Sequence, residues 1–511
     1  MLKGGKALDT MANIGVSSEP LFGRTVIYYD DVEITAKNVA DVIAQALPVH
    51  NKNVSDIDKL YRIYRGEMAI RDKEKSVREE INNKITANFP NNVVSFHTGY
   101  FLGKPIQYVS RGEKTEKLSD EVSDRIDDLN RFADECGKSA DDTDLAEWMF
   151  ICGVGYRMVL QSRYDDSESP FDTFTLDPRQ TLLVRSNDVG HRVLLAATII
   201  QRTDGTIVFN CYTDKMFFKL ETVDSLVSFS SIPLVENNPV PGNPVVGTFK
   251  LTDSKPHILG RVPIVEYTTG NARLGAFELI LPLCDAINAA LSDLADGTQQ
   301  FINALLVIKG ADITDEQFSE LRELGGLKVP SDGDVKYLVS ELNQTQGCER
   351  INLMIDMMLQ VAHLPKRSGG SGGTSDNGVA VFLRDGFVDA ESYANRIEQL
   401  FKKSESEFLR IALRICSMKN ADFNLKLSSV EPHFTRQNTD NLLAKTQALT
   451  TMLASGKIHP LLAFTWSGLC SDPEAAYKIS QEYEQQTIAE EEQRLKDTTV
   501  LNEQTGDVLN E

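Results

Sequence analysis

The sequence predicts a mainly helical α+β protein, and three observations indicate this fold class. Segments with helical spacing open the chain at residues 32–47 and 54–68. Residues 171–221 are rich in β-branched and aromatic residues, interrupted by Asp-Pro and Asp-Gly turn signals, which predicts a meander of strands. Long segments of the second half then repeat apolar residues at i, i+3, i+4 and i+7, as amphipathic helices do.

The composition bounds the size and the partners of the protein. Its 511 residues are 41% hydrophobic, which is enough for sizeable cores and, at roughly 150 residues per domain, suggests about three structural units. Lys and Arg total 53 against 74 Asp and Glu, so the formal charge is -21. An acidic chain gains little from counterion release on a polyanion, which argues against a tight general DNA binder.

The cysteines and the apolar runs indicate the compartment. Seven scattered cysteines without a CxxC pair fit reduced thiols in a cytosolic setting, and we expect no disulfide bonds. The start, "MLKGGKALDTMANIGVSSEPLFG", lacks the apolar run of a signal peptide, and no run of about 18 apolar residues occurs anywhere. We therefore expect a protein that neither follows this secretion route nor spans a membrane.

The first half of the chain begins with about 27 residues that we interpret as a loose arm. Within the strand meander, Thr203 to Thr206 has the composition of a hairpin turn. The segment "LVENNPVPGNPVVGTF" then predicts a loop, and residues 261–267 predict a closing strand.

Two amphipathic helices flank a small insert in the second half. Residues 271–300 predict a long helix that Pro282 bends, and residues 301–340 predict an α/β insert. The second helix ends before Pro365. Its expected apolar face consists of Ile351, Met354, Ile355, Met358, Leu359 and Ala362.

A glycine-rich segment, "LPKRSGGSGGTSDNGVAVF", follows the second helix. Residues 379–416 then predict a helix of roughly 50 Å at 1.5 Å per residue, with Gly386 as a candidate kink. Further helical patterns run to about residue 486, and the acidic tail from Glu490 is interpreted as frayed or disordered.

Motifs for catalysis and phosphate binding fit their surroundings poorly. Gly369 to Gly373 matches GxSxG, with Ser371 as a hydrolase nucleophile, but a helix end and a run of glycines replace the strand and strained turn of that motif. Gly137-Lys138-Ser139 lacks the leading glycine and the strand of a phosphate loop. We therefore predict no enzymatic activity and no cofactor.

The remaining polar candidates have structural interpretations. The seven histidines are isolated in the sequence, without paired metal-ligand spacing, so we predict no metal site. Acidic pairs such as Asp141-Asp142 are interpreted as solvated faces. The methionines Met354, Met357 and Met358 are interpreted as core packing, or as adaptable packing at a subunit interface.

The order of these parts resembles the portal proteins of tailed bacteriophages, of the siphovirus type. The resemblance spans most of the chain, and the order and spacing of its markers make it specific. The markers are "YRIYRGEMAI", "INNKITANFPNNVVSFHTGYFLGKPIQYVS", "WMFICGVGYRMVL", "LDPRQTLLVRSNDVGHRVLLAATI", "VPIVEYTTGNARLGAFELILPLCDAINAALSD", "FINALLVIKG", "SDNGVAVFLRDG" and "VEPHFTRQNTDNLLAKTQAL".

The resemblance implies a ring, usually of twelve subunits, at one capsid vertex, through which the genome enters and leaves. The implied partners are other copies of the chain, double-stranded DNA held weakly and non-specifically in the channel, the terminase, a head-completion adaptor, and the major capsid and scaffolding proteins. The implied location is the virion, and the host cytoplasm during assembly. No membrane partner is expected.

The resemblance also implies an assignment of parts. Residues 28–270 correspond to the wing, 271–300 and 341–364 to two stem helices, 301–340 to the clip and 365–378 to a tunnel loop. Residues 379–434 continue the wing as a long helix and strand, and 435–489 correspond to the crown. The clip surface offered to terminase and adaptor would include Asp315, Glu316, Arg322, Lys328, Asp332, Asp334 and Lys336.

The resemblance implies that the tunnel loop projects into the bore and contacts the DNA. Its composition agrees with this placement, because a Gly- and Ser-rich segment rearranges at low cost and can follow a helical groove. Its members are Lys366, Arg367, Ser368, Gly369, Gly370, Ser371, Gly372, Gly373, Thr374, Ser375, Asp376 and Asn377. Lys366 and Arg367 would meet phosphates transiently.

Simpler interpretations stand beside these. The glycine loop can be a connector that faces solvent, and Lys366 and Arg367 can be ordinary charges at a helix C-terminus, favoured by its dipole. The insert can be a subdomain without a partner. A hydrolase using Ser371 and a non-viral helical scaffold are the alternative functions.

Overall fold

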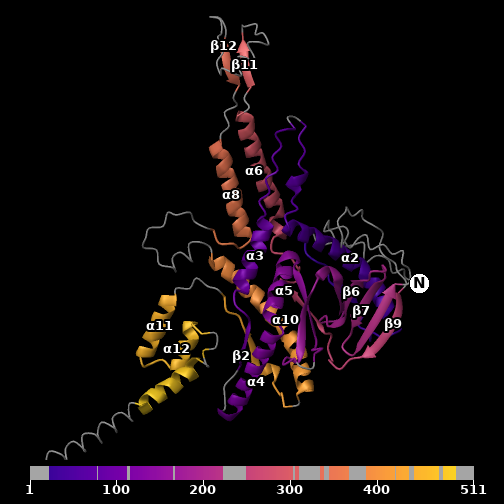
Figure 1. The fold of residues 1–511 in the computed structure, drawn as a ribbon, viewed down its shortest axis with the longest axis vertical. Helices are drawn as coiled ribbons and strands as arrows, with labels where there is room; N and C mark the ends of the chain where they lie inside the picture. Colours follow the sequence, from indigo (N-terminus) through magenta and orange to yellow (C-terminus); the bar gives the residue numbers. More distant parts are fainter. Residues whose placement is uncertain are drawn as a thin grey trace, which may run out of the picture.

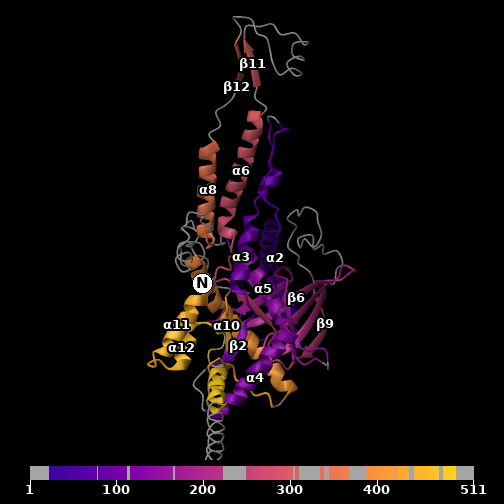
Figure 2. The same ribbon diagram turned by 60° about the vertical axis from the view of Figure 1, so that its left-hand side comes forward.

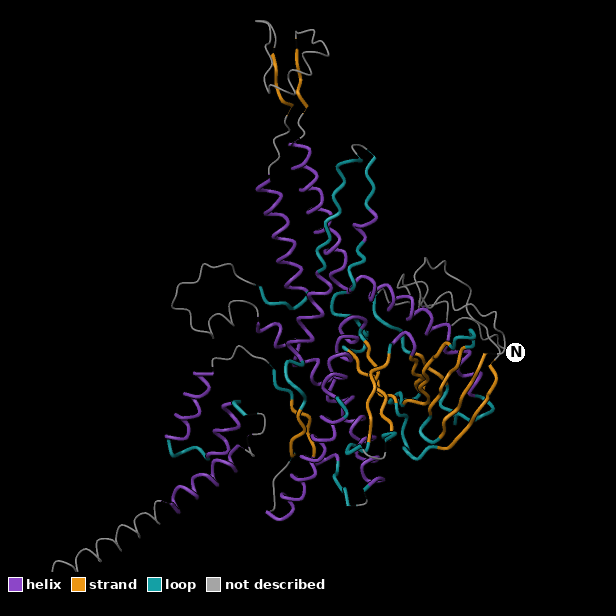
Figure 3. The backbone as a smooth tube through the Cα atoms, viewed as in Figure 1, coloured by secondary structure: helices purple, strands orange, loops and turns teal. Residues whose placement is uncertain are grey.

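The chain folds into an elongated molecule in which a body of helices and sheets carries a projecting pair of helices (Figures 1 and 2). The computed structural model describes residues 22–76, 79–111, 116–164, 167–222, 249–302, 305–309, 334–338, 344–366, 387–420, 422–436, 442–470, 473 and 476–490. Its strands form four sheets among more extensive helices (Figure 3). The predicted mixed fold with a helical majority is confirmed.

A six-stranded sheet lies on one side of the body. Its order is β1-β5-β6-β7-β8-β9, in which β1 runs parallel to β5 and the other neighbours are antiparallel. Arg202 N donates to Thr206 O at 2.9 Å between β6 and β7, so the predicted hairpin is confirmed. The strands are β1 (Ile27–Tyr29), β5 (Thr181–Ser186), β6 (Val193–Gln201), β7 (Ile207–Tyr212), β8 (Met216–Thr222) and β9 (Phe249–Pro256).

Helix α2 (Val39–Tyr64) joins two hydrophobic cores. Its first half buries Ile43 and Leu47 against the six-stranded sheet, and its second half buries Ile57 in the larger core of the body. The prediction of two separate helical segments is wrong here, because the helix continues through Pro48. Burial of both halves offsets the backbone hydrogen bond that a proline cannot donate.

The larger core surrounds the 33-residue helix α10 (Phe387–Lys419), which buries Phe401, Phe408 and Ile411. A three-stranded sheet of order β10-β3-β4 packs there, and β2 pairs with β13. The surrounding elements are α3 (Phe89–Phe101), β2 (Gln107–Ser110), α4 (Glu116–Glu135), α5 (Lys138–Cys152), β3 (Val154–Gln161), β4 (Phe171–Leu176), β10 (Ile264–Thr268) and β13 (Val430–His433).

Shorter helices complete the described chain. Single 3-10 turns occur at η1 (Ala69–Asp72), η2 (Pro178–Gln180), η3 (Glu278–Ile280) and η4 (Leu427–Ser429). Helices α11 (Leu442–Ala454) and α12 (Pro460–Ser467) lie beside the body, and residues 476–490 are helical, with residues 478–490 exposed.

The projection consists of α6 (Leu281–Ile302) and α8 (Gln344–Val361), with the hairpin of β11 (Leu305–Lys309) and β12 (Asp334–Leu338) beyond their far ends (Figures 1 and 2). Pro282 lies in the first turn of α6, so it begins the helix and does not bend it as expected. The first turn needs no backbone donor from that residue.

The end of the expected N-terminal arm differs from the prediction. Residues 22–26 are held against the body: Gly23 N donates to Glu278 Oε2 at 3.1 Å, and the buried Arg24 forms an ion pair with the same carboxylate at 2.8 Å. Residues 1–21, Gly386 and the tail beyond residue 490 lie outside the described residues.

All seven cysteines carry free thiols. Within the described ranges, no helix combines the length and apolar character that a membrane crossing needs.

Candidate functional site: the projecting helices and the root of the glycine loop

Helix α8 presents apolar residues on two faces. The face expected from the sequence packs inward, where Ile351, Met358 and Ala362 are buried. A second stripe at i, i+4 and i+8 stays in solvent: Leu353 is 60% exposed, and Met357 and Val361 are each 51% exposed. The interpretation of Met357 as core packing within this chain is wrong. One protomer therefore leaves a contiguous apolar helix face uncovered.

An extended segment, residues 83–87, runs along α6 and is bound by a polar stripe of that helix. The N–H groups of Asn83, Ile85 and Ala87 donate to the side chains of Asp296, Ser292 and Asn288, at 2.7, 3.0 and 2.9 Å. The spacings match, because two residues of extended chain rise about 6.6 Å and four residues of helix about 6 Å. This polar stripe fixes the segment beside the projection.

Asp296 is the hub of the polar stripe. Lys73 Nζ and Lys75 Nζ each lie 3.0 Å from Asp296 Oδ2, and Asn83 donates twice to Oδ1. Burial raises the pKa of this carboxyl, but the hydrogen bonds from Asn83, Lys75 and Lys73 lower it well below its usual range. Asp296 therefore remains ionised and attracts both lysines at neutral pH.

The projecting helices carry few cations. The acidic residues in α6 and α8 are Asp285, Asp293, Asp296, Glu349 and Asp356, and the basic residue is Arg350. Asp296 is buried and bound by two lysines, but the exposed surface of the two helices still has one arginine and therefore offers phosphates few strong contacts.

The root of the glycine loop is anchored where α8 ends. His97 Nε2 donates to the carbonyl of Ala362 at 2.8 Å, and His363, at φ 55°, stacks on Tyr393 of α10 with ring centroids 5.0 Å apart. Burial lowers the pKa of His97 to about 4, so the ring is neutral at pH 7. The chain thus leaves α8 from a fixed point.

Lys366 is the one predicted DNA-contact residue in the described part of the chain. Its Nζ lies 2.6 Å from Asp356 Oδ2, one exposed pair at the C-terminal end of α8. The other predicted members of the loop lie outside the described residues: Arg367, Ser368, Gly369, Gly370, Ser371, Gly372, Gly373, Thr374, Ser375, Asp376 and Asn377. The predicted loop contact with DNA therefore stays a prediction.

The predicted clip surface is described only in its hairpin. Asp334 and Lys336 belong to β12 and pair in register with Lys309 and Val307. Asp315, Glu316, Arg322, Lys328 and Asp332 lie outside the described residues.

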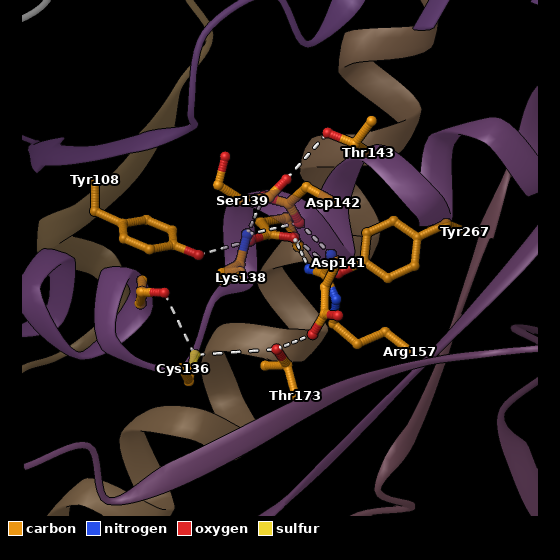
Figure 4. A network of polar contacts seen from close by, with 12 residues as sticks. Tyr108, Cys136, Lys138, Ser139, Asp141, Asp142, Thr143, Arg157, Thr173 and Tyr267 are labelled. Atoms are coloured by element: carbon orange, nitrogen blue, oxygen red, sulfur yellow. Dashed lines mark hydrogen bonds and ion pairs between the residues drawn. The ribbon is translucent and has the colours of Figure 1, made fainter. Parts of the chain in front are cut away.

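A buried network of charges, which the sequence analysis missed, joins the centre of α10 to the body. Figure 4 shows five of its members: Tyr108, Lys138, Asp142, Arg157 and Tyr267. Glu405 is fully buried and lies 2.9 Å from Lys138 Nζ and 3.3 Å from Arg157 Nη1. Tyr108 and Tyr267 donate to its two oxygens at 2.6 and 2.7 Å. Members of the network thus come from five elements: β2, α5, β3, β10 and α10.

Asp142 completes the network, with Lys138 at 2.8 Å and Arg157 as its partners. The interpretation of Asp142 as a solvated residue is wrong, because it is 3% exposed. Lys138, from the incomplete phosphate-loop motif, forms ion pairs with the carboxylates of Asp142 and Glu405. Two cations and two anions balance, as buried charges require.

The network holds Glu405 ionised. Burial alone would raise the pKa of this carboxyl, but the charges of Lys138 and Arg157 have the larger effect and lower the pKa to about 2. Two features of the sequence could have indicated the network: Glu405 falls on the apolar stripe of α10 between Phe401 and Phe408, and Arg157 interrupts an apolar strand.

Among the described side chains, no group of three His, Cys, Asp or Glu could hold a metal ion.

Comparisons with known proteins identify the family. The sequence model described as "Phage portal protein, SPP1 Gp6-like" matches residues 44–497. No curated protein matches. Among solved structures, a chain in "Virion of native gene transfer agent (GTA) particle" has a TM-score of 0.41 and 12% identity, over 81% of this chain and 94% of that one. A chain in "Neck of native GTA particle computed with C12 symmetry" has a TM-score of 0.40 and 10% identity, over 75% and 89%. Because the family model covers most of its length, this chain belongs to the SPP1 Gp6-like family of phage portal proteins.

Proposed function

We propose that copies of this chain close into a ring of about twelve at a capsid vertex and conduct double-stranded DNA during packaging and ejection. Family membership supports a portal role, as a structural component of a virion without catalysis. It disfavours the non-viral scaffold, and Ser371 of the hydrolase alternative lies outside the described residues.

The observation that carries the ring is the exposed stripe of Leu353, Met357 and Val361. An apolar face on a projecting helix is costly in water, and a neighbouring copy in a heterologous ring would cover it. The same ring would make α6 and α8 its stem, and the β11–β12 hairpin with the residues between its strands the clip that docks terminase and adaptor. Residues 28–270 and α10 would form the wing, and α11 and α12 part of the crown.

The second element of the proposal is weak DNA contact. Arg350 is the single basic residue within α6 and α8, so these helices offer DNA few cations, and the glycine loop, which starts from the fixed end of α8, would reach into the bore. Lys366 would contribute little, because Asp356 already neutralises it.

Electron microscopy of the purified chain tests the ring. We expect closed rings with an opening wide enough for duplex DNA, whereas a uniform population of monomers would contradict the proposal.

Deletion of residues 369–373 tests the DNA contact separately: the deleted chain should still form rings but package less DNA. Normal packaging by deleted rings would remove the loop from the mechanism.

A further inference from the structure

A small cavity lies between several elements of the body, and one of its lining residues, Arg273, comes just before η3 and α6. It has a volume of about 20 Å³. Its lining comes from the segment that contains Arg24, Thr25 and Ile27, from α2, β3, η2, β5 and β10, and from Arg273. Space of this size holds one water molecule or one small ion and excludes larger ligands.

Two buried arginines line this cavity with unused donors. Arg24 is 6% exposed and Arg273 is 7% exposed. Each gives one nitrogen to a carboxylate at 2.8 Å, Arg24 to Glu278 and Arg273 to Glu266. Arg24 Nε and Nη1 and Arg273 Nε are buried without a partner. An unmade hydrogen bond from a buried charged group costs more than one from a neutral group.

The charges that line the cavity favour an anion. Arg24 and Arg273 face it together with one carboxylate, Glu266, which also receives Arg185 at 2.6 Å. Burial alone would raise the pKa of Glu266, but Arg273 and Arg185 have the larger effect and lower it. The single negative charge of Glu266 is therefore shared by two arginines. The neighbouring His50 is neutral, because burial lowers its pKa to about 4.

A water molecule fits the donor pattern less well than an ion does. The unpartnered side-chain atoms at the cavity are all N–H groups on cations. Water brings two hydrogens that need acceptors of their own, whereas a halide only accepts. We propose that the cavity binds one small monovalent anion, of the chloride class, between Arg24 and Arg273.

The anion would join two segments that are far apart in the sequence. Arg24 belongs to the end of the N-terminal arm, and Arg273 lies in the left-handed region, at φ 50°, in the turn that leads to η3 and α6. Arg24 N also donates to Ala272 O at 3.3 Å, so the two segments already touch. Chloride would thus stabilise the position from which α6 projects, whether or not copies of the chain assemble.

Bromide is the direct probe, because it replaces chloride and scatters X-rays anomalously. Crystals of the full chain grown or soaked in sodium bromide should give an anomalous peak in contact with Arg24 and Arg273. A map without a peak at this position, including one with only water density there, would overturn the proposal.

A thermal measurement tests the same site in solution. Replacing gluconate, which is too large for the cavity, by chloride at equal ionic strength should raise the Tm of the full chain. In Arg273→Lys, which keeps the charge beside Glu266 but removes the Nε donor, this shift should shrink. The control Arg192→Lys alters an arginine that pairs with Asp31 at the surface and should keep the whole shift. Equal shifts in all three proteins would contradict the site.

Discussion

The centre of the body and the projecting helices distribute polarity in opposite ways. In the body, Glu405 and Arg157 are fully buried, and their partners lie within the same chain. On the projection, Leu353 and Met357 are more than half exposed, and no part of the described chain covers them. The central charge network therefore finds its counter-charges within the chain, whereas the apolar face of α8 is left exposed.

This difference separates the residues that stabilise a single chain from the residues that are available for association with another copy. A buried charge network constrains the body to one arrangement, because each member would be costly without its partners. An exposed apolar stripe imposes no such constraint on one protomer, but it favours association. Mutations in the two regions should therefore have separable effects.

The largest effect is expected on the projection. The double substitution of Leu353→Asp and Met357→Asp places two charges in the proposed subunit contact and should abolish rings. The fold of the protomer should persist, because both side chains are exposed. Mass photometry would report assembly and circular dichroism the fold. Val189→Asp, at an exposed turn, is the control and should assemble normally. Rings formed by the double variant would refute the contact.

The next effect is expected in the body. Glu405→Gln should lower the free energy of unfolding by about 3–5 kcal/mol, because Lys138 and Arg157 stay buried without a full counter-charge. Glu407→Gln, two residues away on α10, breaks exposed pairs with Arg261 and Arg410 and should cost at most about 1 kcal/mol. Denaturant titration measures both. Equal losses would mean that the network does not hold the body together.

Acid should weaken the body through the same carboxylate. The pKa of Glu405 is depressed to about 2, while its unfolded value is about 4.3, so its stabilisation is complete above pH 4.3 and is lost as pH falls towards 2. The loss is of order 3 kcal/mol. Unfolding curves between pH 5 and pH 2 should be steeper in pH for the wild type than for Glu405→Gln. Parallel curves would assign acid sensitivity to other groups.

A smaller effect is expected at the polar stripe of α6. Asp296→Asn removes the charge that attracts Lys73 and Lys75. It should lower the free energy of local opening, in which residues 83–87 detach from α6, by about 1–3 kcal/mol. Hydrogen exchange at the N–H of Asn83 should accelerate. The exposed neighbour Asp293 provides the control, since Asp293→Asn should leave that exchange rate nearly unchanged. Unaltered exchange in Asp296→Asn would contradict the role of the stripe.

The sequence predicted the parts whose signals are local. Apolar periodicity placed the inner face of α8, and turn composition placed the hairpin at Thr203 to Thr206. The local rule that a proline bends a helix failed for Pro282, because this residue lies in the first turn of α6. Pro48 was not considered in the sequence, and burial of both halves of α2 keeps that helix continuous through it. Local pattern is thus sufficient only where one segment determines its own structure.

The charge network could not be assembled from sequence, because its members are far apart. Tyr108 and Glu405, which share a hydrogen bond, are separated by 297 positions. Asp142 looks the same in sequence as any solvated acid on a helix. The second stripe of α8 was readable as i, i+4, i+8 spacing, but its exposure depends on which face meets α6. Of the predicted site, the described structure locates Lys366, Asp334 and Lys336, and the proposed loop and clip surfaces remain predictions.

A cryo-EM reconstruction of the assembled full chain tests the central claim most directly. The account predicts that Leu353, Met357 and Val361 of each copy are buried against an adjoining copy around a central opening, while Glu405 keeps its partners within its own chain. A closed ring in which these three side chains face solvent would contradict it.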